Sequence, residues 1–166
     1  MVKDFGKFIN INPKKLDIIV LAAEVHDVGK FYIPKNMLLK KGKLTKNEMH
    51  IIRSHSIRSI EELKKRNMEE SIINIVKHHH ESYDGSGYPS GLIGEDIPFE
   101  SRVIKICDVF DAITNKRVYR NIVYNYEEAI KIMENMKNEF DPILYKLFNE
   151  YIKNSNLLLK NEKIFI

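Results

Sequence analysis

Hydrophobic residues recur along most of the chain at the three- and four-residue spacing of amphipathic helices. Asn12 and Pro13 are typical of a helix cap followed by a first-turn proline. Four apolar residues then follow at helical spacing: Leu16, Ile19, Val20 and Ala23. Gly29 and Pro34 are expected to end this segment.

Similar signals predict further helices downstream. Thr45 and Glu48 form a capping-box pattern at the start of a helix that runs past Leu63. Other helices are predicted over 70–81 and 101–115, from Asn125, and from the pair Asp141-Pro142. No stretch alternates apolar and polar residues as a half-buried strand does. The pattern therefore predicts an all-α fold.

One segment interrupts the helical pattern. Residues 83–98 contain four of the seven glycines and two of the five prolines. Connections in helical domains usually have about 2–8 residues, and longer loops in compact domains are often functional. We therefore expect a functional loop here, although a plain exposed turn is the simpler alternative.

Length and composition limit the remaining possibilities. A chain of 166 residues suits a single domain, with 153–166 as a C-terminal tail. The net charge of +4 suits an anionic ligand, but without a long basic run it does not indicate nucleic-acid binding. Cys107, the only cysteine, is expected to be buried and inert. The absence of a signal peptide or a membrane-length apolar run predicts a cytoplasmic protein.

Several histidines fall on helix faces that should be apolar. At about 100° per residue, His79 and His80 lie about 40° and 60° from the mean direction of Ile72, Ile73, Ile75 and Val76, whereas His78 lies about 140° away and should face solvent. His55 and His26 extend the apolar faces of their own helices in the same way. Converging buried imidazoles are best explained by a bound metal. His50 lacks this context, and we expect it to lie on the surface.

Two carboxylates continue the same pattern. Asp108 follows Ile104 by four residues, and Asp111 follows Asp108 by three. A carboxylate that points inward without a cation costs roughly several kcal/mol of folding free energy. Binding a metal ion would remove that cost for Asp108. For Asp111 either a ligand role or an outer, orienting role fits, and we prefer the second.

Cationic residues stand near these candidates. Lys30 follows His26-Asp27 by three residues, and Arg117 and Arg120 follow Asp108. Each alone is most often a solvated charge, but beside a metal centre such side chains can hold phosphate oxygens.

Together these segments resemble the HD-GYP family of the HD superfamily. His26-Asp27-Val28-Gly29-Lys30 is similar to the His-Asp motif, and His79-His80-Glu81 with 84–89 is similar to the signature containing Gly-Tyr-Pro. Further matching segments occur in the family's order, and the similarity covers 12–150. A His-Asp pair alone is weak evidence, whereas the full ordered set is highly specific.

The resemblance implies a helical HD bundle that hydrolyses cyclic di-GMP to pGpG or GMP, with a hydroxide that bridges two ions as the nucleophile. It implies two or three divalent ions, iron or manganese, and GGDEF-type cyclase domains or a sensor domain as partners. The implied metal ligands are His26, Asp27, His55, His79, His80 and Asp108. Asp27 and Lys30 would be catalytic, with Glu81 and Asp111 outside the ligands. The implied substrate-binding residues are Lys30, Tyr88, Arg117 and Arg120.

The sequence departs from the family pattern in two places. The superfamily has a further histidine ligand on a helix upstream of His26, but no histidine precedes His26 here, and 1–10 resembles the end of that helix. Val118 stands where proline is usual. Two alternatives therefore stay open: a catalytically impaired regulatory or docking module, and a phosphodiesterase for another nucleotide such as cyclic GMP-AMP.

Overall fold

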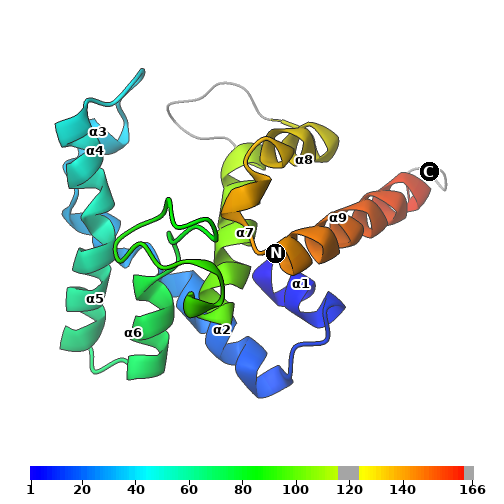
Figure 1. Cartoon of the computed structure of the whole chain (residues 1–166), viewed down its shortest axis with the longest axis horizontal. Coiled ribbons are helices and arrows are strands. Elements are labelled where there is room, and N and C mark those ends of the chain that lie inside the picture. The colour runs from blue at the N-terminus through cyan, green and yellow to red at the C-terminus, as the bar shows by residue number, and fades with distance from the viewer. Residues whose placement is uncertain (116–123, 163–166) are drawn as a thin grey trace.

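Helices make up the regular structure of the described residues, 1–115 and 124–162, in the computed structural model of the chain, and no strand occurs among them. The α-helices, labelled in Figure 1, are α1 (Val2–Phe8), α2 (Pro13–Val25), α3 (Lys35–Leu38), α4 (Lys46–Arg53), α5 (His55–Lys65), α6 (Glu70–Lys77), α7 (Phe99–Thr114), α8 (Tyr126–Glu134) and α9 (Pro142–Glu162). Short 3-10 helices are η1 (Val28–Tyr32), η2 (Gly94–Asp96) and η3 (Lys137–Glu139). The all-α prediction is confirmed.

The predicted helix starts are present with their caps. The side chain of Asn12 accepts a hydrogen bond from the backbone at the start of α2, and capping boxes begin α4 at Thr45 and α8 at Asn125. Asp141 accepts from the backbone of Ile143 at 2.8 Å at the start of α9. Two bounds differ from the prediction: the helix expected from 45 is broken at 54 into α4 and α5, and α6 ends at 77 instead of 81.

Helix α7 forms the centre of the core. It packs against α1, α2, α6, α8 and α9, and lies between the left and right halves of the molecule in Figure 1. Phe110 of α7, Phe5 of α1 and Phe148 of α9 form an aromatic cluster, with ring centroids 5.3 and 5.0 Å apart around Phe148. Arg102 and Asp141 join α7 to α9 through a nearly buried ion pair of 2.5 Å. Cys107 is buried as predicted.

The segment after α2 lies tightly against α5. The amide of Gly29 donates to the hydroxyl of Ser59 at 2.8 Å, and this hydroxyl donates to the carbonyl oxygen of His26 at 3.0 Å. A Cβ at position 29 would lie only 2.1 Å from the carbonyl oxygen of His55, so only glycine allows this approach. The contact places the ends of α2 and α5 side by side.

The glycine-rich loop folds back on the turn after α6. The buried carboxylate of Glu81 accepts hydrogen bonds from the backbone of Ser90 at 2.6 Å and of Leu92 at 3.2 Å. The amide of Tyr83 donates to the carbonyl oxygen of Glu139 at 2.9 Å, which ties the loop to η3. The Tyr88-Pro89 peptide bond is cis. The loop is thus an ordered part of the fold that covers the end of α6.

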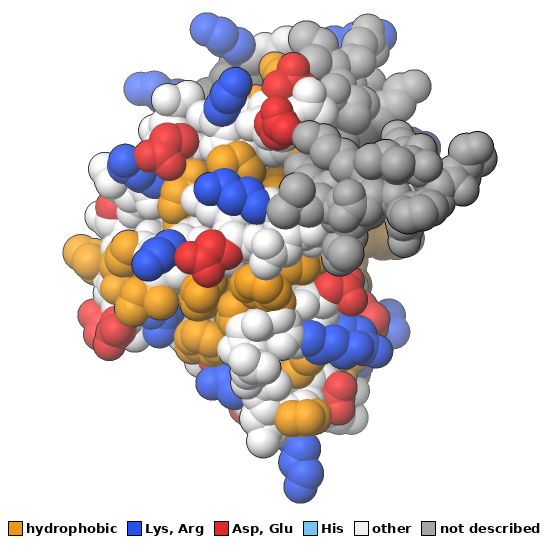
Figure 2. Space-filling model, turned by 90° about the vertical axis from the view of Figure 1, so that its right-hand side faces the viewer, with side chains coloured by type: hydrophobic (Ala, Val, Ile, Leu, Met, Phe, Trp, Pro, Cys, Tyr) orange, Lys and Arg blue, Asp and Glu red, His pale blue; other side chains and the backbone are white. Residues whose placement is uncertain are grey.

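The C-terminal helix and α1 share one side of the molecule (Figure 1). On this face, hydrophobic side chains gather across the middle and lower part, with charged side chains of both signs among them (Figure 2). Helix α9 continues to Glu162, so 153–162 of the segment predicted as a tail are helical. Within the described ranges, no helix combines the length and hydrophobicity that crossing a membrane requires.

Candidate metal centre

Four of the predicted site residues meet at one point between the helices. One potential ligand atom from each lies within 4.8 Å of the others, in the set Asp27, His55, His79 and His80. Asp27 precedes η1, His55 begins α5, and the other two histidines lie in the turn after α6. Residues from three separate segments therefore converge.

Three imidazole rings are held in the same way. The Nδ1 atoms of His26, His55 and His79 lie 2.6, 2.6 and 2.5 Å from the carbonyl oxygens three residues earlier in the chain. Since a carbonyl oxygen only accepts, each Nδ1 carries the proton, and each Nε2 keeps its lone pair. Such hydrogen bonds orient histidine ligands in metal sites, leaving Nε2 to face the metal.

Asp27 lies between two histidines and the ammonium of Lys30. Its carboxylate oxygens lie 3.3 Å from Nε2 of His55 and 3.2 Å from Nε2 of His26, and it pairs with the ammonium of Lys30. Burial alone would raise the pKa of Asp27, but His26 and Lys30 hold it well below its usual range. Asp27 is therefore an anion at the centre of the cluster.

Burial keeps the inner imidazoles neutral. It lowers the pKa of His79 to about 3, and it also lowers the pKa values of His55 and His80. Burial would lower the pKa of His26 as well, but the carboxylate charge of Asp27, 3.2 Å from its Nε2, outweighs burial and raises that pKa. Neutral imidazole is the form that binds metal.

The donor set fits a divalent cation. Among the described residues, buried Nε2 of His26, Nε2 of His79 and Oδ1 of Asp27 lack hydrogen-bond partners. Nε2 of His80 lies 3.0 Å from the Nε2 lone pair of His55. Burying these polar atoms is costly unless something pairs with them, and a cation would satisfy several at once. Imidazole and carboxylate together suit iron, manganese or zinc.

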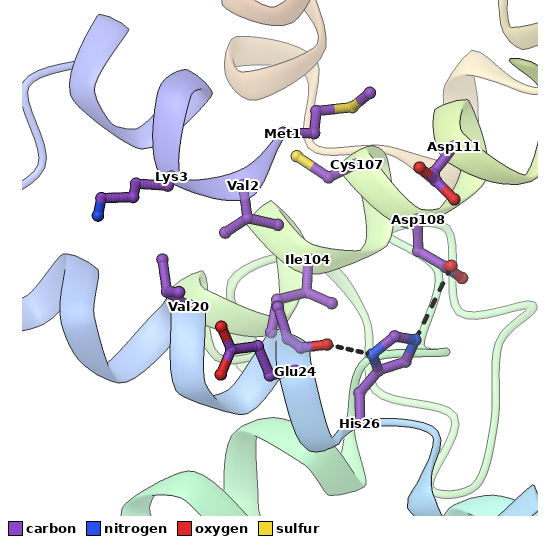
Figure 3. Close-up of a pocket in the computed structure, with 11 residues that line it drawn as sticks. Met1, Val2, Lys3, Val20, Glu24, His26, Ile104, Cys107, Asp108 and Asp111 are labelled. Carbon is purple, nitrogen blue, oxygen red and sulfur yellow. Dashed lines mark hydrogen bonds and ion pairs between the residues drawn. The ribbon is translucent and has the colours of Figure 1, made fainter. Parts of the chain in front are cut away.

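His26 and Asp108 lie at the edge of the four-residue set. Nε2 of His26, at the end of α2, is 3.8 Å from Oδ1 of Asp108 on α7. As Figure 3 shows, both residues line a pocket of about 400 Å³ that α1 closes on the opposite side. Asp111 lines the same pocket, its carboxylate accepts from the side chain of Asn115 at 2.7 Å, and it is not among the four clustered residues.

The prediction for His78 is wrong. It is buried, with 7% of its surface exposed, and its Nδ1 lies 3.0 Å from the carbonyl oxygen of Asn74. The helical-angle estimate fails because α6 ends at Lys77, so the angles of an ideal helix do not apply to the following turn. The turn, and not the helix, directs the side chains of His79 and His80 inward. His50 is exposed, as predicted.

The remaining predicted residues occupy different places. The ring of Tyr88 lies 4.9 Å from that of His80, at the edge of the cluster. Burial raises the pKa of the Tyr88 hydroxyl, which therefore stays protonated. Glu81 holds the loop and contacts no described metal-ligand candidate through its carboxylate. Arg117 and Arg120, together with Val118, lie outside the described residues.

Sequence reasoning overlooked three residues that lie at or beside the site. Ser59 joins the segments that carry His26 and His55, and its position four residues after His55 was the available signal. Lys105 is nearly buried beside the cluster, where its ammonium contacts Ser82 at 3.3 Å. Arg53 lies over the ring of Tyr88 at 4.8 Å. Isolated basic residues carry no periodic signal, so neither could be found by pattern.

Sequence comparison finds relatives that are named as phosphodiesterases. A probable cyclic di-GMP phosphodiesterase of Vibrio cholerae is 38% identical over 146 residues, covering 83% of this chain and 33% of the relative. A 3'3'-cGAMP-specific phosphodiesterase of the same organism is 39% identical over 137 residues, covering 81% of this chain and 26% of the relative. The chain thus spans a quarter to a third of the length of these relatives.

A solved structure and a family model support the same assignment. The structure of a protein from Bdellovibrio bacteriovorus, described as HDG"Y"P, superposes with a TM-score of 0.73 at 20% identity, covering 92% of this chain and 49% of that one. At this identity the likeness shows a shared fold. The model described as HD domain matches residues 1–144. The chain therefore belongs to the HD domain family.

Proposed function

We propose that this chain is the catalytic domain of a metal-dependent phosphodiesterase that hydrolyses cyclic di-GMP to pGpG or GMP. The observation that carries the proposal is the convergence of Asp27, His55, His79 and His80 within 4.8 Å. The relative named as a probable cyclic di-GMP phosphodiesterase supports the choice of substrate. The glycine-rich loop beside the cluster supplies one wall of the substrate site.

These four residues, with His26 and Asp108 at the edge, would hold two or three divalent ions, iron or manganese. When bound, such ions polarise the phosphoryl group and lower the pKa of water to make a nucleophile at neutral pH. The two oxygens of Asp27 lie 3.3 and 3.2 Å from Nε2 of His55 and of His26, so this carboxylate would hold metal together with both rings. The hydrogen-bonded rings of His26, His55 and His79 need no rearrangement to bind.

Lys30 and Tyr88 are the candidates for contacting the substrate. The ammonium of Lys30 pairs with Asp27 while keeping 32% of its side chain exposed, so it can also reach a non-bridging phosphate oxygen. Charge that develops on that oxygen would be offset by the ammonium. The protonated hydroxyl of Tyr88 can donate a hydrogen bond to the phosphate or the ribose. Arg117 and Arg120 are proposed as further phosphate contacts from their sequence position alone.

Cyclic GMP-AMP is the second candidate substrate. The 3'3'-cGAMP-specific relative is as similar to this chain, at 39% identity, as the cyclic di-GMP relative. Both compounds contain the 3',5'-phosphodiester that the cluster would act on, so the choice depends on contacts with the bases. Comparing kcat/KM for the two compounds at equal concentrations would identify the preferred one.

The resemblance also motivates a proposal about partners. The loop over 83–98 would dock a GGDEF-type cyclase domain, and a sensor domain would regulate the phosphodiesterase. Ile93 supports the docking proposal, because 61% of its surface is exposed at the loop. Pull-down of a purified GGDEF domain by the wild-type chain, but not by an Ile93→Asp variant, would support docking. Equal capture by both would contradict it.

The test of the proposed function combines metal analysis with an assay. The chain is purified, loaded with Mn²⁺ or Fe²⁺ without oxygen, and incubated with cyclic di-GMP. We expect bound metal and release of pGpG or GMP, both lost in the Asp27→Ala variant and retained in Asp17→Ala, which removes an exposed carboxylate of α2. Metal binding without hydrolysis of either cyclic dinucleotide would contradict the proposal and favour a regulatory or docking module.

A further inference from the structure

Arg53, the last residue of α4, carries a charge that the site described above does not use. Its guanidinium lies 4.8 Å from the centre of the Tyr88 ring, and that ring lies 4.9 Å from the ring of His80. Arg53 is exposed, and within the described residues no carboxylate pairs with it. Of the other described cations near the cluster, Lys30 pairs with Asp27 and Lys105 pairs with Glu139.

The contact with Tyr88 leaves the hydrogen-bonding capacity of Arg53 available. A cation over a ring interacts through the ring face, so the in-plane N–H groups of the guanidinium remain free to donate. An exposed cation–π contact is weaker than a hydrogen bond to a charged group. A phosphate would therefore compete successfully with the ring for this guanidinium.

Arg53 also stands at the border of a second recess. An open groove of about 430 Å³ lies beside it and is lined by Leu44, Thr45, Lys46, Met49, His50 and Arg53. This lining contains two cationic side chains and one imidazole but no carboxylate. The nearby Glu48 is paired with Lys40 at 2.7 Å, so an adjacent ammonium offsets its charge. The recess therefore favours an anionic ligand with an apolar part.

We propose that Arg53 binds the phosphodiester of the cyclic dinucleotide that is not being cleaved, and that the groove beside it receives the adjoining nucleoside. The proposal rests on the proposed function. A cyclic dinucleotide carries two phosphodiesters, and while one occupies the cluster the other must be held outside it. Arg53 is separated from the cluster by the single ring of Tyr88, and a planar guanidinium suits bidentate phosphate binding.

The test compares a substrate with two phosphodiesters and one with a single phosphodiester. We would measure KM and kcat of the Mn²⁺-loaded chain for cyclic di-GMP and for bis(p-nitrophenyl) phosphate. Arg53→Ala should raise KM for cyclic di-GMP about tenfold or more, the loss expected for a charged hydrogen bond. It should leave kcat, and hydrolysis of the small substrate, within about two-fold. Arg53→Lys should give an intermediate KM.

Arg58 provides the matched control, because it is an exposed arginine five residues away on α5. Arg58→Ala removes the same charge and should change neither substrate's kinetics. Equal losses on both substrates in Arg53→Ala would place its effect on the metal centre or on Tyr88 and overturn the proposal. An unchanged KM for cyclic di-GMP, or the same rise in Arg58→Ala, would also overturn it.

If the proposed function is wrong, the wild-type chain will hydrolyse neither substrate, which differs from every outcome for Arg53 given above. Arg53 is in that case tested by equilibrium dialysis with cyclic di-GMP. The dissociation constant should rise about tenfold in Arg53→Ala and stay unchanged in Arg58→Ala. Equal affinities in the two variants, or no binding by the wild-type chain, would overturn the proposal.

Discussion

The backbone of Gly29 lies against the carbonyl oxygen of His55, so that a Cβ at position 29 would be 2.1 Å from that oxygen. This approach sets the distance between η1, which follows Asp27, and α5, which begins with His55. The same glycine donates to Ser59, whose hydroxyl reaches His26. The spacing of the cluster therefore depends on a residue that carries no ligand atom.

We expect Gly29→Ala to reduce metal affinity and to lower the free energy of unfolding by about 1–3 kcal/mol, because the added methyl group must displace the backbone of α5. Metal titration and thermal denaturation would measure the two effects. Gly42→Ala serves as the control, since nothing lies within 4 Å of a Cβ there. It carries backbone strain at its φ of 110° but should bind metal normally. Unchanged metal affinity in Gly29→Ala would contradict this account.

His79 and His78 should differ in how much they contribute to metal affinity. His79→Ala removes an unpartnered Nε2 from the cluster and should weaken binding by more than about a hundredfold. His78→Ala is the matched control, because His78 is also buried but lies outside the four-residue set. It should lose stability while retaining metal, as measured by elemental analysis after dialysis. Comparable metal loss in both variants would show that unfolding is the cause.

Glu81 should stabilise the loop without binding metal. Its buried carboxylate accepts two backbone hydrogen bonds from the loop, at 2.6 and 3.2 Å. Glu81→Ala should cost about 1.5–3 kcal/mol of unfolding free energy, because these amides lose a charged acceptor. We expect faster proteolysis within 83–98 and unchanged metal content. Loss of metal with the loop still protected would instead place Glu81 among the ligands.

The metal-free chain should become less stable as the pH falls from 7 toward 5. The folded chain holds the pKa of His79 at about 3, whereas the unfolded chain takes up the proton near 6.5. Below about pH 6.5 the unfolded state binds more protons, so acid lowers stability until the folded pKa is reached. His55 and His80 act in the same direction, while the raised pKa of His26 opposes them.

Thermal denaturation of the chain in EDTA at several pH values measures this dependence. Tm should fall on acidification, and the fall should be smaller in His79→Gln, which lacks one of the buried imidazoles. A Tm that is constant or rises between pH 7 and 5 would mean that the buried histidines are not held neutral.

Much of the fold was predictable because local chemistry determines where helices begin. The caps at Asn12, Thr45, Asn125 and Asp141 are all present, since each depends only on residues a few positions away. The broken helix at Ser54 was not predictable from the apolar spacing, which continues through it. The break lets α5 begin with His55, which brings this ring to the cluster.

The sequence predicted four residues that lie together in the structure, but it did not predict their arrangement. His79 and His80 were expected to face inward from a helix, yet they do so from the turn beyond Lys77, where helical angles no longer apply. The roles of Ser59 and Arg53 depend on contacts between segments distant in sequence. A single sequence contains no periodic signal for such contacts.

Anomalous diffraction from crystals of the Mn²⁺-loaded chain tests the central claim most directly. We expect manganese peaks between Asp27, His55, His79 and His80, with the Nε2 atoms of the histidines as ligands. Peaks only at surface carboxylates, or an empty cluster at saturating Mn²⁺, would contradict the account.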